Sequence, residues 1–263
     1  MRRVLLCSLW LAIALPISVP VCSATDRPDF SGIWQVADPA LIVALTLSDA
    51  DPQKRQVADP NAPLRPVLMP AAKQRIDYFL ANFDYRGVDD QGHQCVLNGM
   101  PWLMTAQIPY PIEILQTDKR MVMFFELHDR KRNIYFDISK QPAEVFPSSE
   151  GFSIGRWEGS TLVIETSALK ASSEFSLRQR SDKAHIIERW NRVQDPKFGE
   201  TIVIDMTIAD PETFSPPFKA RQVYKRAPAN TWVGEYSCAD ALWEENIAKR
   251  KIEIERRKVS APK

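Results

Sequence analysis

Residues 151–155 read Gly-Phe-Ser-Ile-Gly and match the G-x-S-x-G nucleophile elbow of serine hydrolases. In that elbow the serine sits on a sharp turn from a strand into a helix, whose N-terminal amides help to stabilise an oxyanion. Here Ser153 is followed by Glu158-Gly159 and a second apolar run, a pattern typical of a two-residue β-hairpin. We therefore expect Ser153 to be an alternating strand residue and not a nucleophile.

A second group of reactive side chains lies on two predicted strands, 120–128 and 133–138, joined by a turn at 129–132. Period-2 alternation gathers on one face of this pair Val122, Phe124, Glu126, His128, Tyr135 and Asp137. A carboxylate among aromatic rings suits general acid or base catalysis, so Glu126 and Tyr135 are candidate catalytic residues. The alternative is a solvent face with a cross-strand hydrogen bond.

The predicted hairpin of strands 184–193 and 201–208 carries a lone acid, Glu188, on an apolar face with Trp190 and Met206. Burial of an unpaired carboxylate costs several kcal/mol, so Glu188 should have either a partner or a function. It is the third catalytic candidate. Glu165 is a further candidate for an inward acid, and Arg156 is the structural partner that either acid could have.

The remaining candidates would line a ligand site rather than react. They are Phe124, Asp137, Glu165, Trp190 and Met206. The opposite face of the second hairpin carries His185 and an expected Arg189–Asp205 ion pair, which places His185 outside.

The residue types and their spacing give little support for a metal or cofactor site. The three histidines (His93, His128 and His185) have no familiar ligand spacing, so no metal is expected. With nine glycines and neither G-x-G-x-x-G nor C-x-x-C-H, the sequence offers no nucleotide, flavin or haem motif, and we expect no cofactor.

The N-terminus predicts export. Residues 1–24 combine Arg2 and Arg3, an apolar run over 4–14 and small residues at 22–24, as in a secretory signal peptide. The expected location is periplasmic or secreted, and there an isolated pair, Cys95 and Cys238, is most simply a disulfide. The rest of the chain has 32 basic and 33 acidic side chains, which gives no sign of a nucleic-acid partner. No later run is long enough to span a membrane.

The elements that must position these residues are mostly strands. From residue 111 onward short β-branched or aromatic runs follow one another without an intervening helical pattern, which predicts an antiparallel all-β meander. With residues 30–36 as the first strand there are about nine strands, enough to close a barrel over 25–238. A helical insertion is expected at about 71–83, and a basic helix and tail at 239–263.

Two stretches resemble known families. Gly32-Ile33-Trp34 resembles the G-x-W signature of lipocalins and related calycin barrels, in which the tryptophan closes one barrel end against an arginine of the last strand. This resemblance implies Arg221 or Arg226 as that arginine.

The second resemblance covers most of the chain after residue 24. Residues 151–166, 181–190 and 207–214 are similar to a family of secreted, mostly uncharacterised bacterial proteins that carry G-x-S-x-G-R-W-E-G-D-T-L-V-V-x-T. It too implies a lipocalin-like barrel. Where that family usually reads D-G-R-x-H-P, this chain has Asp137-Ile138-Ser139-Lys140-Gln141-Pro142, so a function that relies on the family's histidine does not carry over.

Three functions remain open from the sequence. The first is a barrel that binds a small apolar molecule, and the second is a cofactor-free isomerase, hydratase or lyase that uses acid and base carboxylates. The third is a structural or interaction barrel filled by its own side chains. An enzyme needs an acid and a base that converge on one position, whereas a binder needs an apolar cavity with one or two polar anchors. Oligomeric state is not encoded in these patterns.

Overall fold

The computed structural model describes residues 27–37, 67–82, 99–105, 110–172, 180–236 and 240–260. The expected signal peptide and both cysteines of the expected disulfide, Cys95 and Cys238, lie outside these residues. The helices and strands are β1 (Gly32–Val36), α1 (Pro70–Asn82), α2 (Trp102–Thr105), β2 (Ile112–Gln116), β3 (Arg120–Phe125), the 3-10 turn η4 (Leu127–Asp129), β4 (Arg130–Tyr135), β5 (Phe152–Glu158), β6 (Thr161–Ser167), β7 (His185–Asp195), β8 (Gly199–Ala209), β9 (Phe218–Arg226) and α3 (Asp240–Ser260).

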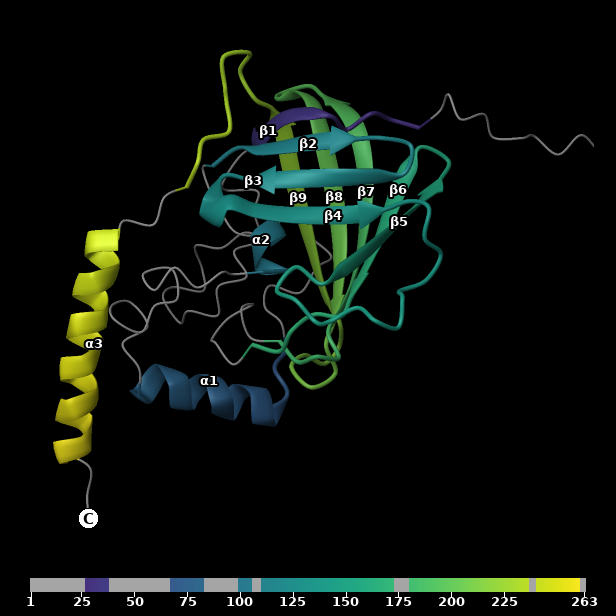
Figure 1. Cartoon of the computed structure of the whole chain (residues 1–263). Coiled ribbons are helices and arrows are strands. Elements are labelled where there is room, and N and C mark those ends of the chain that lie inside the picture. Colours follow the sequence, from purple (N-terminus) through teal and green to yellow (C-terminus); the bar gives the residue numbers. More distant parts are fainter. Residues whose placement is uncertain are drawn as a thin grey trace, which may run out of the picture.

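The nine strands form one closed barrel in the order of the sequence (Figure 1). The last strand pairs with the first: Trp34 lies opposite Arg226 and Val36 opposite Tyr224. Closure leaves no unpaired sheet edge, which explains how many short strands give one stable layer. The expected all-β barrel is confirmed.

One junction differs from the expected antiparallel meander. β4 and β5 run parallel over two residue pairs, Ile134 with Ser153 and Tyr135 with Ile154. The connection over 136–151 has to cross from one barrel end to the other, because a parallel neighbour must start where its partner started. The barrel is therefore mixed, with a single parallel joint.

The register of the β3–β4 hairpin also differs from the expected one. The turn falls at 126–129, where His128 and Asp129 adopt positive φ values of 59° and 48°, and Arg120 lies opposite Tyr135. The predicted turn at 129–132 is wrong, and with it the proximity of Glu126 to Tyr135. Within the strands the two faces keep their members, because the shift is an even number of residues, but Glu126 and His128 lie in the turn and Asp137 follows the end of β4.

The other two hairpins follow the sequence closely. In β7–β8, Glu188 lies opposite Met206 and Trp190 opposite Ile204, as alternation predicts. In β5–β6, Glu158 pairs with Thr161, so the two-residue loop is Gly159-Ser160, one position later than expected.

One end of the barrel, called the closed end below, is sealed by aromatic rings. Trp34 is fully buried, donates from Nε1 to the Phe30 carbonyl at 2.8 Å, and carries the Arg226 guanidinium 3.8 Å above its ring. Arg226 also donates to the carbonyl of Ser31 at 2.8 Å. A Cβ at Gly32 would lie 2.1 Å from Arg226 Nη1, so only glycine fits there. Of the two arginines expected, Arg226 is thus the one against Trp34.

The opposite end, called the mouth below, is formed by the ends of β1 and β3, the start of β2, and Tyr224 of β9, which lies opposite Val36. α2 packs near β9, and its segment buries Met100, Leu103 and Met104 in the barrel core. Five of the seven methionines of the chain belong to this core: Met100, Met104, Met121, Met123 and Met206. Methionine side chains are unbranched and adaptable, so this interior can repack at low cost.

The two longer helices lie outside the barrel (Figure 1). α1 matches the helix expected at about 71–83, and α3 matches the expected C-terminal helix. Among the described residues, no helix has the length and apolar character that crossing a bilayer requires.

Candidate functional site

A charged pair lies inside the barrel. Arg132 of β4 and Glu188 of β7 form a bidentate ion pair, with Nη1 donating to Oε1 at 3.2 Å and Nη2 to Oε2, and their side chains are 1% and 0% exposed. Two hydroxyls complete the cluster: Arg132 Nε donates to Ser153 Oγ at 3.2 Å, and Nη2 donates to Thr166 Oγ1 at 2.9 Å. The partner that Glu188 requires is therefore Arg132, not Arg156.

This partner has a signal in the sequence. Arg132 has the same parity on β4 as the inward residues Ile134 and Phe136, so alternation alone points it into the barrel. The turn predicted at 129–132 hides this signal, because it takes residue 132 out of the strand. Ser153, as expected, is a strand residue on β5, is 1% exposed, and bonds Thr166 at 2.9 Å.

Next to this satisfied cluster, two inward groups have polar atoms outside hydrogen-bond geometry. Gln222 of β9 is 1% exposed, and its amide interacts with the Tyr224 hydroxyl, but neither its Oε1 nor its Nε2 meets hydrogen-bond geometry within the part of the chain that the structure describes. The same holds for Nε1 of Trp190, which is fully buried on β7. Buried polar groups are nearly always hydrogen-bonded, so these three atoms call for a water or a ligand group.

Tyr224 connects these groups to the mouth. It follows Gln222 on the same face of β9 and is 4% exposed. Burial raises the pKa of Tyr224 to about 12, and the negative charge of Glu188 adds to this, while the Gln222 amide and the Arg132 charge act in the opposite direction. The Tyr224 hydroxyl therefore stays protonated at neutral pH and is a hydrogen-bond donor inside the barrel.

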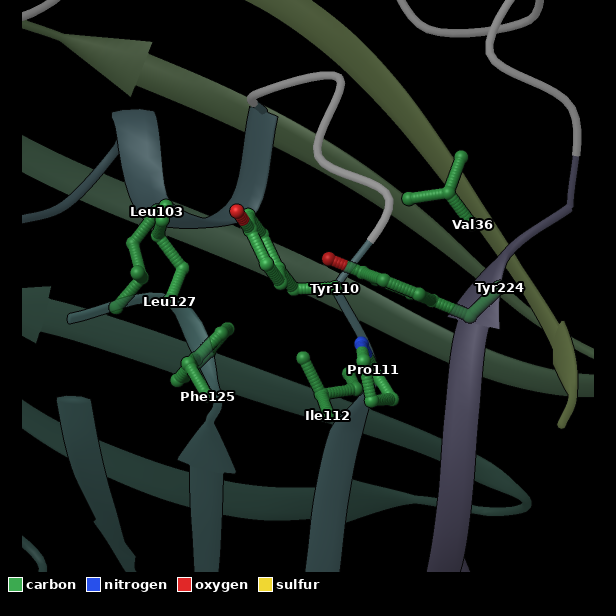
Figure 2. A pocket seen from close by; sticks show the side chains of 8 residues that line it. All are labelled: Val36, Leu103, Tyr110, Pro111, Ile112, Phe125, Leu127 and Tyr224. Carbon is green, nitrogen blue, oxygen red and sulfur yellow. The ribbon is translucent and has the colours of Figure 1, made fainter. Parts of the chain in front are cut away.

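A small cavity opens at the mouth beside Tyr224 (Figure 2). The space open to the centre of a water molecule is about 10 Å³, roughly the room that one water needs. Its walls are mostly apolar, with Tyr110 and Tyr224 as the polar exceptions. The lining residues are Val36, Leu103, Tyr110, Pro111, Ile112, Phe125, Leu127 and Tyr224.

Of the residues proposed from sequence, Glu188, Trp190 and Met206 point inward and lie within the same core. Five others, Glu165 among them, do not join them. Phe124, Tyr135 and Asp137 alternate with the inward residues of β3 and β4 and lie on the outer face, where Tyr135 stacks on Phe152 at 5.1 Å. Glu126 lies in the β3–β4 turn and accepts the backbone N–H of Gly234 at 2.8 Å.

Glu165 is not an inward acid. Its side chain is 42% exposed and forms an ion pair with Arg156 on the neighbouring strand. The expected Arg189–Asp205 pair is also replaced, because Asp205 binds Arg221 at 2.5 Å and Arg189 binds Glu158 at 2.9 Å. A side chain on the surface of a sheet has possible ion-pair partners on both neighbouring strands. A prediction from one hairpin considers only one of these strands.

The three catalytic candidates do not converge on one position of the barrel. The inward acid Glu188 is bonded to Arg132, and the other two catalytic candidates, Glu126 and Tyr135, lie elsewhere on the barrel. Within the described residues, no group of three or more His, Cys, Asp or Glu side chains is placed to hold a metal ion. Comparison with protein-family models, curated proteins and solved structures gave no match to this chain.

Proposed function

We propose that this barrel binds a small, mostly apolar molecule in its interior, through the mouth beside Tyr224. The observation that carries the proposal is Gln222, a buried carboxamide whose donor and acceptor both lie outside hydrogen-bond geometry among the described residues, with the Tyr224 hydroxyl as a polar neighbour. An apolar cavity with a few fixed polar groups is the usual design of a small-molecule site. In keeping with the lipocalin-like resemblance and the expected signal peptide, we place this function in the periplasm or outside the cell.

Access requires local repacking rather than a preformed tunnel. Leu103 lines the mouth cavity and Met104 belongs to the barrel core, and both come from the α2 segment and not from the barrel wall. Displacement of such side chains by apolar ligand atoms exchanges one set of dispersion contacts for another. The five core methionines make this exchange feasible.

The Arg132–Glu188 pair has a different role in this proposal. Because each hydrogen-bonding atom of the pair already has a partner, it contributes a fixed, electrically neutral wall beside the ligand. An uncharged ligand group then suits the interior better than an ion, since a buried ion would have no counter-charge.

The test compares Gln222→Leu with Gln194→Leu, an equal change on the exposed side of β7. Without ligand, Gln222→Leu should be at least as stable as the wild type, because it removes an unsatisfied buried amide. With the small-molecule fraction of a bacterial periplasmic extract, the wild type and Gln194→Leu should show a raised Tm, as for any ligand that binds only the folded state. Gln222→Leu should lose most of that rise. Equal shifts for all three proteins would remove Gln222 from the site.

A further inference from the structure

The chain after β9 returns along the outside of the barrel to the mouth, where residues Thr231–Tyr236 form a segment that we call the strap (Figure 1). Two carboxylates hold it by backbone hydrogen bonds. Glu126 Oε2 accepts the N–H of Gly234 at 2.8 Å, and Asp129 Oδ1 accepts the N–H of Tyr236 at 2.9 Å. Both acids belong to the β3–β4 turn, whose Leu127 lines the mouth cavity.

The strap reaches the cavity through one aromatic contact. The ring of Tyr236 packs edge-on against Tyr110, with centroids 6.1 Å apart, and against His128 at 4.9 Å. Tyr110 is 37% exposed and forms a wall of the mouth cavity opposite Tyr224 (Figure 2). The position of the strap therefore sets the position of this wall.

We infer that Glu126 and Asp129 act as a latch: by holding the strap, they keep Tyr110 over the mouth and so control how fast a ligand enters and leaves the barrel. This inference rests on the proposed function, because it assigns a gate to the proposed site. The latch touches neither Gln222 nor the Arg132–Glu188 pair. Its release should therefore speed association and dissociation together and leave the dissociation constant nearly unchanged.

The test uses the full chain and the uncharged apolar fluorophore N-phenyl-1-naphthylamine as probe, followed by stopped-flow fluorescence. Only the phase that Val36→Trp removes is counted, since that substitution fills the mouth cavity. In the double variant Glu126→Ala/Asp129→Ala both rate constants should rise about tenfold, the equivalent of one hydrogen bond of about 1.4 kcal/mol.

Two matched variants separate the latch from charge and from general loosening. Glu126→Gln/Asp129→Asn keeps a carbonyl acceptor at each position and should retain rates near those of the wild type. Asp118→Ala/Glu144→Ala removes two exposed acids, one from the β2–β3 turn and one from the β4–β5 connection, and should leave the rates unchanged.

Hydrogen exchange at the amides of Gly234 and Tyr236 gives a readout that needs no ligand. The alanine double variant should exchange at these two amides faster than the wild type, while the β7–β8 amides stay protected. Faster exchange with unchanged probe rates would refute the gate and leave the binding function intact. Absence of any Val36→Trp-sensitive phase in the wild type would instead refute binding through the mouth, and the gate with it.

Discussion

At the scale of single residues, the central feature is an ion pair shielded from water. Arg132 and Glu188 are 1% and 0% exposed and bond each other, Ser153 and Thr166. Desolvation of two charges costs several kcal/mol, which the pair recovers only while both members are present. The pair therefore fixes the interior of the barrel more than it adds net stability.

This argument predicts a non-additive double-mutant cycle. Glu188→Gln or Arg132→Met alone should lower the free energy of unfolding by about 3–5 kcal/mol, because each leaves an uncompensated buried group. Arg132→Met/Glu188→Leu should cost much less than the sum of the two. Urea denaturation of the four proteins measures this, and additive losses would show that the pair is not coupled.

Tyr224 predicts a distinct alkaline behaviour. Burial raises the pKa of Tyr224 to about 12, above the value of about 10 in an unfolded chain. Between pH 10 and 12 the unfolded state releases this proton and the folded state keeps it, so stability falls as pH rises through that window. The loss should reach about 3 kcal/mol, or two pKa units, and Tyr224→Phe should lack it. Denaturation curves from pH 9 to 12 that run parallel for both proteins would contradict the assignment.

The sequence alone predicts correctly which side chains point inward where alternation within a single strand determines this. Alternation along β7 and β8 placed Glu188, Trp190 and Met206 inward. It could not supply Arg132, which reaches Glu188 from a strand 56 residues earlier in the chain. Nor could it show that Gln222 lacks a partner, because that depends on the packing of all the surrounding strands.

At the scale of elements, the closed end depends on β1 and β9 together. Arg226 stacks on Trp34, donates to the Ser31 carbonyl and binds Glu200 at 3.0 Å. Its hydrogen bond lowers the pKa of the Glu200 carboxyl, and its charge adds to this. These bonds join the first and last strands at the closure of the barrel.

We expect Arg226→Lys to lower the free energy of unfolding by about 1–3 kcal/mol, because lysine cannot stack and donate in the same planar geometry. The control is Arg221→Lys on the same strand, which alters an exposed pair with Asp205 and should cost less than about 1 kcal/mol. The measurement is thermal or urea unfolding of both variants. Equal losses would mean that Arg226 has no special role in closure.

The error in the β3–β4 turn has an element-level cause. Residues 129–132 read Asp-Arg-Lys-Arg, a charged run that usually marks a turn. In the barrel three of them begin β4, with Arg130 bonded to Glu150 at 2.8 Å and Arg132 buried on Glu188. Arg130 and Arg132 are tolerated in a strand because each has a specific ion-pair partner on another part of the chain. A single sequence does not show which residues form such pairs.

For the molecule as a whole, the closed barrel could be predicted from the sequence. Nine apolar runs separated by polar turns leave few alternatives to a closed sheet, and the nine strands of the structure correspond to them. The parallel pairing of β4 and β5 could not be predicted from the sequence. The direction of a strand after a long connection depends on whether that connection crosses from one end of the barrel to the other. The candidate site is harder to predict from the sequence than the fold, because its polar side chains come from three separate strands, β4, β7 and β9.

A small molecule bonded to Gln222 inside the barrel should survive gentle purification and be visible by native mass spectrometry of protein taken from the periplasm without denaturation. We expect a bound small-molecule mass on the wild type and on Gln194→Leu, and little or none on Gln222→Leu. Binding at Gln222 is refuted if all three proteins carry only the mass of the chain, even after incubation with periplasmic extract, or if Gln222→Leu retains the full adduct.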